Sequence, residues 1–295
     1  SAITGLIVKE ILQNDLNIPI NVNQNYIIPN WVNKYTLVIA CSYSGNTEET
    51  LIAYEECYKK NAKIIGFTTG GLLLKTIKSN NHSYTLMPPG LQPRAALGYS
   101  LPLLIMMLNK IGAIKNSYVE NLKESITILK EKTIKYSKPT IDNIAFNIAS
   151  NIYDKNPLIY AEDGVFNTIG YRFKSQLVEN SKILAFNNKV PEMNHNEIEA
   201  FTNNVNKNNN FIVIWINDSS YHARNKKRIK VVSEIWKNKI DNQLSIEIKL
   251  DDSENKILNY LSYLHLVDWI SYHAAILKKI DPSIIPNINE LKNAL

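Results

Sequence analysis

The sequence predicts an α/β protein with two successive parallel sheets, each flanked by helices. Short runs of β-branched and other apolar residues alternate with helical apolar spacing, which is typical of parallel sheets covered by helices. The alternation is interrupted at Ser137-Lys138-Pro139 and then starts again. Because 295 residues suit one large or two medium domains, we expect one domain over residues 1–136 and another over residues 137–295.

The first domain is expected to fold as β-α-β-α-β followed by two longer helices. The expected strands are Thr36–Cys41, Ala62–Thr68 and Ser83–Met87. The expected helices are Thr47–Asn61, Leu72–Ser79, Ala95–Ile111 and Val119–Tyr136. The last two carry apolar residues along one stripe, so each is expected to pack against the body of a domain.

The second domain repeats this alternation. Its expected strands are Leu158–Ala161, Ile183–Phe186, Phe211–Ile216 and Leu244–Leu250. Its expected helices are Ile141–Tyr153, Thr168–Asn180, a short helix from Glu197, His222–Lys237, Glu254–Lys279 and Asn287–Leu295. The run Phe211–Ile216 is nearly all apolar, as a strand buried on both faces of a parallel sheet should be.

The net charge of the chain favours anionic partners. It is formally +6, with a pI of about 9.0. The densest basic cluster, Arg224–Lys230, lies in an expected helix that also carries apolar Val232 and Trp236. A solvated helix face explains this cluster better than a nucleic-acid patch, because no RNA- or DNA-binding motif accompanies it. We therefore expect no nucleic-acid partner.

Several features bear on the location of the protein. No apolar run reaches the roughly 18 residues of a membrane span, and residues 1–5 lack the charge pattern of a signal peptide. Cys41 and Cys57 lie in apolar contexts, where reduced buried thiols are the usual interpretation. These features favour a cytoplasmic protein. The chain starts at Ser1 rather than at methionine, so its start is expected to be processed or truncated.

The most informative segment is the hydroxyl-rich turn Ser42-Tyr43-Ser44-Gly45-Asn46-Thr47, between an expected strand and an expected helix. The first turn of a helix offers unpaired N–H groups and the positive end of the helix dipole, so hydroxyls there favour a phosphate or another small anion. Asn46 is the expected N-cap, and Glu49 would complete a capping box. An ordinary, well-capped turn is an equally good interpretation of these residues alone.

Three further segments carry candidate residues. Arg94 opens a helix after a rigid Pro- and Gly-containing loop, where a guanidinium suits a phosphate or an oxyanion. Glu179 stands near the end of an expected helix, and alone would be interpreted as a solvated acid. His195 lies in a polar turn close to carboxylates, and either acid–base work or a plain turn fits it.

Several common sites are missing from the sequence. The five histidines are not spaced as metal ligands, and there is no Cys-x-x-Cys pair. There is also no phosphate-binding Walker loop, no G-x-G-x-x-G and no G-x-S-x-G elbow. We expect neither a metal nor a cofactor.

Taken in order, these segments resemble a known family. The Ser42–Thr50 turn resembles the phosphosugar-binding turn of sugar isomerase (SIS) domains. Pro93-Arg94, Glu179-Asn180 with Lys182, Asn194-His195-Asn196 and Leu291-Lys292 resemble, in that order, the archaeal-type bifunctional phosphoglucose/phosphomannose isomerases. The resemblance covers nearly the whole chain and implies tandem SIS domains, a phosphorylated hexose substrate and a homodimer with active sites at its interface.

The resemblance also implies a role for each motif residue. Ser42, Ser44 and Thr47 would hold the sugar phosphate, and Arg94 would stabilise the enediolate. Glu179 would move the proton between C1 and C2. His195, donated by the partner subunit, and Lys292 would help to open the sugar ring. The reaction implied is the interconversion of glucose 6-phosphate and fructose 6-phosphate without a metal.

The chain departs from the family pattern at two places. The family has a Gly-Gly-Ser turn near its N-terminus that touches the substrate, and Ser1 would be the remnant of that turn. Ile285 stands before Pro286, where a threonine is the feature associated with mannose 6-phosphate. Glucose 6-phosphate isomerisation is therefore the firmer expectation.

Two other interpretations remain open. A non-catalytic phosphosugar-binding regulator would need the phosphate turn but not a base, and no DNA-binding segment precedes the first domain in this sequence. An aminosugar synthase half would be accompanied by a glutaminase domain, which this sequence does not contain. The ordered set of Arg94, Glu179, His195 and Lys292 favours the isomerase over both.

Overall fold

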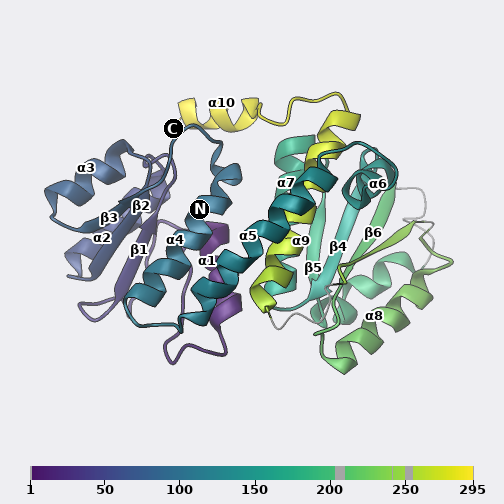
Figure 1. The fold of residues 1–295 in the computed structure, drawn as a ribbon, viewed down its shortest axis with the longest axis horizontal. Helices are drawn as coiled ribbons and strands as arrows, with labels where there is room; N and C mark the ends of the chain where they lie inside the picture. The colour runs from purple at the N-terminus through teal and green to yellow at the C-terminus, as the bar shows by residue number, and fades with distance from the viewer. Residues whose placement is uncertain (1, 203–209, 241, 250–254, 295) are drawn as a thin grey trace. The chain divides into compact units, whose positions relative to one another are not determined.

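The computed structural model describes residues 2–202, 210–240, 242–249 and 255–294. They divide into two compact units, Ser1–Val119 and Glu120–Leu295 (Figure 1). Each unit is a parallel sheet flanked by helices, so the predicted α/β class is confirmed. No helix in the described part of the chain is long and apolar enough to cross a membrane.

The first unit holds a three-stranded sheet in the order β1-β2-β3. Its strands are β1 (Leu37–Cys41), β2 (Lys63–Thr68) and β3 (Ser83–Leu86). Its helices are α1 (Ala2–Leu12), α2 (Glu48–Lys59), α3 (Gly71–Ser79), the 3-10 turn η1 (Pro93–Ala96) and α4 (Leu97–Lys110). Helices α2 and α3 lie on one face of the sheet, and α1 and α4 on the other (Figure 1).

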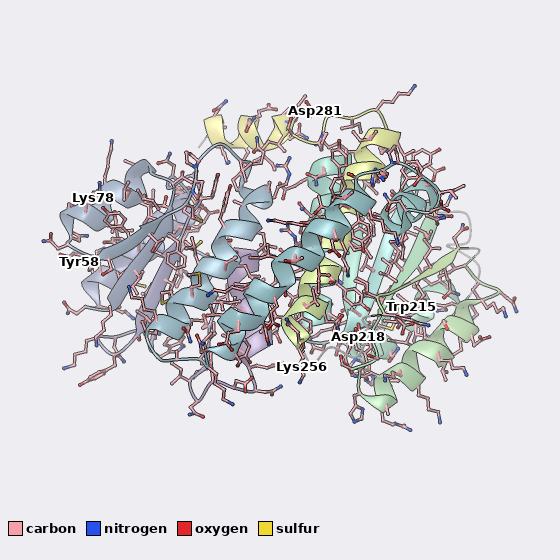
Figure 2. All side chains as sticks on the ribbon, in the orientation of Figure 1. Tyr58, Lys78, Trp215, Asp218, Lys256 and Asp281 are labelled. Carbon is pink, nitrogen blue, oxygen red and sulfur yellow. The ribbon has the colours of Figure 1, made fainter. Side chains whose placement is uncertain are left out.

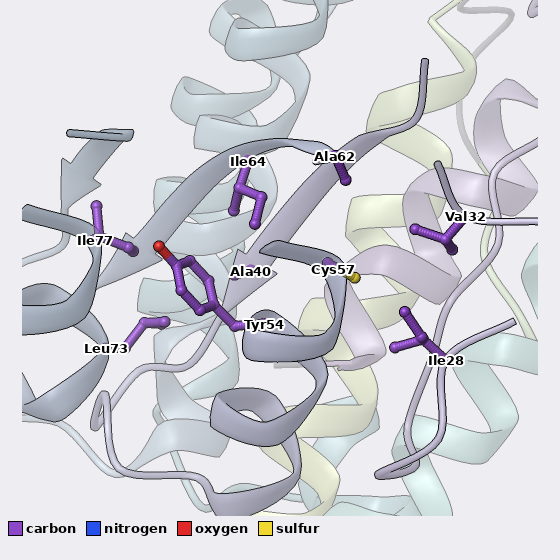
Figure 3. Close-up of a cluster of buried hydrophobic side chains, with 9 residues drawn as sticks. All are labelled: Ile28, Val32, Ala40, Tyr54, Cys57, Ala62, Ile64, Leu73 and Ile77. Carbon is purple, nitrogen blue, oxygen red and sulfur yellow. The ribbon is translucent and has the colours of Figure 1, made fainter. Parts of the chain in front are cut away.

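A cluster of buried side chains joins α2 and α3 to the sheet (Figure 3). Figure 3 shows side chains from the loop before β1, from β1 and β2, and from both helices directed into one core. The members are Ile28, Val32, Ala40, Tyr54, Cys57, Ala62, Ile64, Leu73 and Ile77. This core holds the starts of α2 and α3 at the carboxyl edge of the strands.

Helix α1 is absent from the sequence-based expectation. Ile7, Val8 and Leu12 are fully buried, and the buried hydroxyls of Thr4 and Ser100 lie 2.6 Å apart, which joins α1 to α4. Because α1 is followed by a long irregular segment, the alternation that identified the other elements does not extend to it.

The second unit holds a four-stranded sheet in the order β5-β4-β6-β7. Its strands are β4 (Asn156–Glu162), β5 (Phe186–Val190), β6 (Phe211–Asn217) and β7 (Gln243–Glu247). Its helices are α5 (Ser117–Tyr136, which starts in the first unit), α6 (Ile144–Ile152), α7 (Val165–Ser181), α8 (Ala223–Trp236), α9 (Lys256–Leu277) and α10 (Pro286–Ala294). Two 3-10 turns, η2 (Glu192–His195) and η3 (Glu197–Phe201), follow β5.

The two faces of this sheet are covered differently. Helices α6, α7 and α9 lie on one face and α8 on the other (Figure 1). On the α8 face, Trp215, which is labelled in Figure 2, stacks beside Tyr160 and Trp236, with ring centroids 5.2 and 5.8 Å away. Aromatic contacts of this kind add stability beyond the area they bury.

Two expected boundaries differ from the structure. The division between units falls inside α5, not after Tyr136, because α5 bonds to α9: Lys132 Nζ donates to Ser262 Oγ at 2.9 Å. The break at Pro139 marks the end of α5, but it does not tell which unit α5 packs against. The strand expected at Ile183–Phe186 lies later, at Phe186–Val190, because β5 is a polar edge strand and the apolar residues before it only lead into it.

The α5–α9 contact contains a histidine that should make stability depend on pH. His265 Nε2 accepts a hydrogen bond from Trp269 Nε1 at 3.0 Å and lies 3.0 Å from Thr133 Oγ1. Its other ring nitrogen, Nδ1, is buried and has no hydrogen-bond partner among the described residues. Burial lowers the pKa of His265, and nearby Lys132 adds to this effect while Asp268 opposes it. The folded protein therefore favours the neutral ring.

The unfolded chain should bind a proton at His265 near the ordinary pKa of about 6.5, before the folded chain does. The free energy of unfolding is thus expected to fall as the pH drops below about 6.5, by at most about 1.4 kcal/mol per pH unit. Urea unfolding at pH 7.5 and pH 5.5 measures this loss. His265→Gln, which keeps an acceptor but cannot titrate, should lose less; an equal loss in both chains would contradict the prediction.

Candidate functional site

The turn after β1 folds around the hydroxyl of Ser42. Ser42 Oγ lies 2.8 Å from Thr47 Oγ1 and accepts the Gly45 N–H at 3.1 Å. Ser44 Oγ accepts the Asn46 N–H at 3.2 Å. Ser42 is buried, whereas Ser44 and Thr47 are exposed. The structure thus brings these three predicted hydroxyls into one turn at the start of α2, with two of them facing solvent.

The predicted capping box is wrong. The N-cap of α2 is Thr47, whose side chain makes no capping bond in the described structure, and Asn46 Oδ1 instead accepts the Leu72 N–H at 2.9 Å. Asn46 therefore caps the first turn of α3 instead of α2, and the first N–H groups of α2 have no side-chain cap in the described structure. Glu48 Oε2 accepts the hydroxyl of Tyr26 at 3.0 Å, which draws this carboxylate toward the loop before β1.

A second loop, residues 68–71 after β2, packs directly on this turn. Thr69 donates to Tyr43 O through both its N–H and its hydroxyl, at 3.0 and 2.8 Å, and the Leu73 N–H donates to Gly45 O at 2.8 Å. Gly45 and Gly71 have φ values of +71° and +69°. A Cβ built on Gly45 would lie 1.8 Å from Gly70 O, so the close approach of the two loops requires glycine.

A third loop carries Arg94. Tyr43 OH donates to Pro88 O at 2.7 Å and accepts the Leu91 N–H at 3.1 Å. The side chain of Tyr43 thus joins the predicted phosphate-binding turn after β1 to the loop that carries Arg94. Half-buried Arg94 lies in η1, and it lines a small pocket together with Tyr43 and Met87.

The sequence patterns did not predict that Tyr43 and the loop 68–71 support the turn after β1. The Thr68-Thr69-Gly70-Gly71 sequence at a strand end was the available signal.

All three loops follow the carboxyl ends of neighbouring parallel strands, the edge at which α/β sheets bind ligands.

The corresponding turn of the second unit, which follows β4, has carboxylates in place of hydroxyls. Glu162 Oε1 accepts the His222 N–H at 3.0 Å and Asn225 Nδ2 at 2.7 Å, and Asp163 Oδ1 accepts the Gly164 N–H at 3.0 Å. Carboxylates already occupy these donors, so this turn is unsuited to a phosphate.

Glu179 lies on the last turn of α7 and is half-buried. A hydrogen-bond network between α7 and α9 fixes this turn. Arg172, which is 4% exposed, donates to both carboxylate oxygens of Asp268, at 2.9 and 2.7 Å, and Gln176 Nε2 donates to Asp268 Oδ1 at 2.9 Å. One turn later, Asn180 Nδ2 donates to Ser271 Oγ at 2.9 Å. Glu179 therefore stands on a rigid helix end.

His195 and Lys292 occupy other parts of the second unit. Both are exposed, His195 at the end of η2 and Lys292 on α10. Glu179 precedes β5 and so lies at the edge where the strands begin, whereas His195 follows β5 at the edge where they end. The structure therefore does not bring Glu179 and His195 of one chain together. Ser1 lies outside the described residues.

No arrangement of three or more His, Cys, Asp or Glu side chains suited to a metal ion occurs within the described residues. The described residues instead offer a hydroxyl-rich turn with an adjacent arginine in one unit, and a fixed carboxylate, an exposed imidazole and an exposed amine in the other. This is a set for binding an anion, offsetting an oxyanion and transferring protons.

Residues 141–295 match the family described as bacterial phospho-glucose isomerase C-terminal SIS domain. A bifunctional phosphoglucose/phosphomannose isomerase of Caldicellulosiruptor bescii is 35% identical, covering 100% of this chain and 86% of that protein. One of Thermoplasma volcanium is 34% identical, covering 100% of this chain and 88% of that protein.

A solved structure shares the fold. The C-terminal domain of glucosamine-fructose-6-phosphate aminotransferase from Francisella tularensis superposes with a TM-score of 0.71 at 18% identity, covering 96% of this chain and 83% of that one. At this identity the likeness concerns the fold alone.

Proposed function

The chain belongs to the family of bifunctional phosphoglucose/phosphomannose isomerases and is a phosphosugar isomerase; we propose that it interconverts glucose 6-phosphate and fructose 6-phosphate through a cis-enediol. The observation that carries this proposal is the turn Ser42–Thr47. It places exposed hydroxyls and uncapped helix N–H groups beside a loop bearing Arg94. Such a turn suits a sugar phosphate.

Each proposed role follows from the chemistry of the residue. Ser42, Ser44 and Thr47 bind the phosphate, so binding energy from a remote group positions the reacting carbons. Glu179 removes the proton from one carbon and returns it to the next, and Arg94 offsets the negative charge on the enediolate oxygen. A carboxylate and a cation together perform this transfer without a metal. His195 and Lys292 assist ring opening, for which an imidazole titrating near neutral pH is suited.

The proposed assembly is a homodimer in which His195 acts on the substrate held by the other subunit. The positions of Glu179 and His195 at opposite edges of one sheet support it. β5 alone separates these edges by about 16 Å, at roughly 3.3 Å per residue. A general acid or base must lie within hydrogen-bond reach of the proton it transfers, so one substrate cannot use both groups from one chain.

A coupled assay with fructose 6-phosphate tests the function. Turnover that is competitively inhibited by inorganic phosphate is expected, and Ser44→Ala should raise both KM and the inhibition constant of phosphate. Binding of fructose 6-phosphate without any turnover would support instead the second candidate, a phosphosugar-binding regulator. The phosphate turn alone would suffice for that role.

Residue 285 is expected to decide whether the protein also accepts mannose 6-phosphate. Ile285 is half-buried at the N-cap of α10, and its carbonyl accepts the Asn289 N–H at 3.1 Å. The isoleucine side chain cannot hydrogen-bond a sugar hydroxyl or a water. Ile285→Thr is therefore expected to raise kcat/KM for mannose 6-phosphate by about tenfold, the worth of one hydrogen bond of about 1.4 kcal/mol. Threonine is also favoured at an N-cap, so the helix should persist. Equal mannose 6-phosphate activity in the parent and the variant would contradict this prediction.

A further inference from the structure

Lys182 ends α7 in an unfavourable backbone conformation. Its φ is +55° and its ψ +36°, the left-handed region that glycine or asparagine normally occupies at this position. For a lysine this conformation costs about 1–2 kcal/mol. Glu179 lies three residues before it. Lys279 has a similar φ of +57°, so the backbone conformation alone assigns no role to Lys182, and the contacts of its side chain must do so.

The ammonium group of Lys182 joins two segments of the second unit. Nζ donates to the carbonyl of Glu179 at 2.5 Å and to the carbonyl of Ile284 at 2.6 Å. The first contact places a cation at the carboxyl end of α7, where the helix dipole favours it. The second fastens the segment that leads to α10. A single side chain thus connects the turn of the proposed base to the start of the helix that carries Lys292.

The segment leading to α10 is itself a compact turn. Asp281, labelled in Figure 2, lies just before α10, and its Oδ1 accepts the N–H and the hydroxyl of Ser283 at 2.8 and 2.6 Å. The bonds from Ser283 lower the pKa of Asp281, and the charge of Lys182 adds to this effect. Asp281 is therefore a carboxylate that the Lys182 ammonium attracts.

Helix α10 needs such an anchor. None of its described side chains is buried, so packing does not fix its direction. Lys292 lies about 10 Å along the helix axis from Ile285, at 1.5 Å per residue. A small change of angle at the anchor therefore moves Lys292 by ångströms. Misplacement of a catalytic group by about 1 Å can lower a rate about a hundredfold.

We propose that Lys182 is a positioning residue: by bridging the Glu179 and Ile284 carbonyls it holds α10, and with it Lys292, in a fixed relation to the turn that carries Glu179. This inference rests on the proposed function for the roles of Glu179 and Lys292. The bridge itself concerns only main-chain carbonyls, so it can be tested without catalysis.

The first test measures hydrogen exchange in α10. Lys182→Met removes the ammonium and keeps the aliphatic stem, and it is expected to speed exchange of the amides of residues 287–294 about tenfold, because local opening becomes easier. Lys174→Met, on the same helix but with its ammonium over the Tyr171 ring, is the matched control and should leave this exchange unchanged. Unchanged exchange in Lys182→Met would overturn the bridge, whatever the chain catalyses.

The second test is a double-mutant cycle on kcat for fructose 6-phosphate. Lys182→Met is expected to lower kcat by about ten- to a hundredfold in the parent and to have little further effect in Lys292→Met, since both changes remove the same positioned amine. Lys182→Arg, whose guanidinium can also donate to two carbonyls, should restore part of the loss. Additive effects would overturn the positioning role. Failure of the proposed function appears separately, as a parent chain that does not turn over fructose 6-phosphate.

Discussion

Glu179→Gln is expected to lower kcat for fructose 6-phosphate by about 10²- to 10⁴-fold, the usual contribution of a general acid–base group. The amide has nearly the shape of the carboxylate but cannot accept the C1 or C2 proton. The Lys182 bridge ends on the main-chain carbonyl of Glu179, not on its side chain. The replacement therefore leaves the bridge in place, and the melting temperature should stay within about 2 °C of the parent value.

Binding separates this loss from a folding defect. The proposed phosphate contacts are in the first unit and Glu179 is in the second, so the dissociation constant of inorganic phosphate should be unchanged in Glu179→Gln. Glu234→Gln, an exposed carboxylate on α8, is the control and should keep full activity. Full activity in Glu179→Gln would remove Glu179 from the mechanism, and loss of phosphate binding together with activity would indicate a wider structural change.

Local patterns predicted most elements of the fold because their signals are local. The strand β6 and the turn after β1 are defined by neighbouring residues, and both lie where the sequence predicts them. Helix α5 was assigned to the wrong unit because its partner, α9, is more than a hundred residues away. The strand β5 was shifted because an edge strand can be polar, and neither its pairing nor its position in the sheet can be derived from local spacing.

In the candidate site, too, local patterns predicted the residues of each motif but not the contacts between distant segments. Residue types and their order predicted which groups are candidates for the site, and the hydroxyls of Ser42 and Thr47 do meet in the turn. The contacts that support this turn could not be predicted from local patterns: Asn46 caps the start of α3, 26 residues away, and Tyr43 OH bonds a loop more than 40 residues away. The separation of Glu179 and His195 onto opposite edges of the sheet follows from chain order, because the first precedes β5 and the second follows it.

The second large effect is expected at Gly45. Gly45→Ala should lower the free energy of unfolding by more than about 2 kcal/mol. The left-handed backbone at φ +71° costs alanine about 1–2 kcal/mol. In addition, the new Cβ would lie 1.8 Å from Gly70 O and 2.8 Å from Thr68 Oγ1. Because the first of these is a backbone atom, the two loops must separate, and urea unfolding measures the cost.

Two other glycines separate the causes of this effect. Gly112 has φ +74°, but no described atom lies within 4 Å of its built Cβ, so Gly112→Ala should show the backbone cost alone. Gly98 lies within α4 and its Cβ also meets nothing within 4 Å, so Gly98→Ala should be neutral or stabilising by up to about 1 kcal/mol. Equal losses of unfolding free energy in Gly45→Ala and Gly112→Ala would contradict the expected clash between the new Cβ and Gly70 O.

The same variant links stability to substrate binding. Separating the loops moves the carbonyl of Gly45 away from the Leu73 N–H and the carbonyl of Tyr43 away from the N–H and hydroxyl of Thr69, so the turn loses the bonds that hold it in place. Since Ser42 Oγ organises the turn through Thr47, the proposed phosphate site opens with it. KM for fructose 6-phosphate and the inhibition constant of phosphate should therefore rise together by at least about tenfold, which corresponds to about 1.4 kcal/mol of lost binding. A destabilised Gly45→Ala chain that binds phosphate normally would place the phosphate elsewhere.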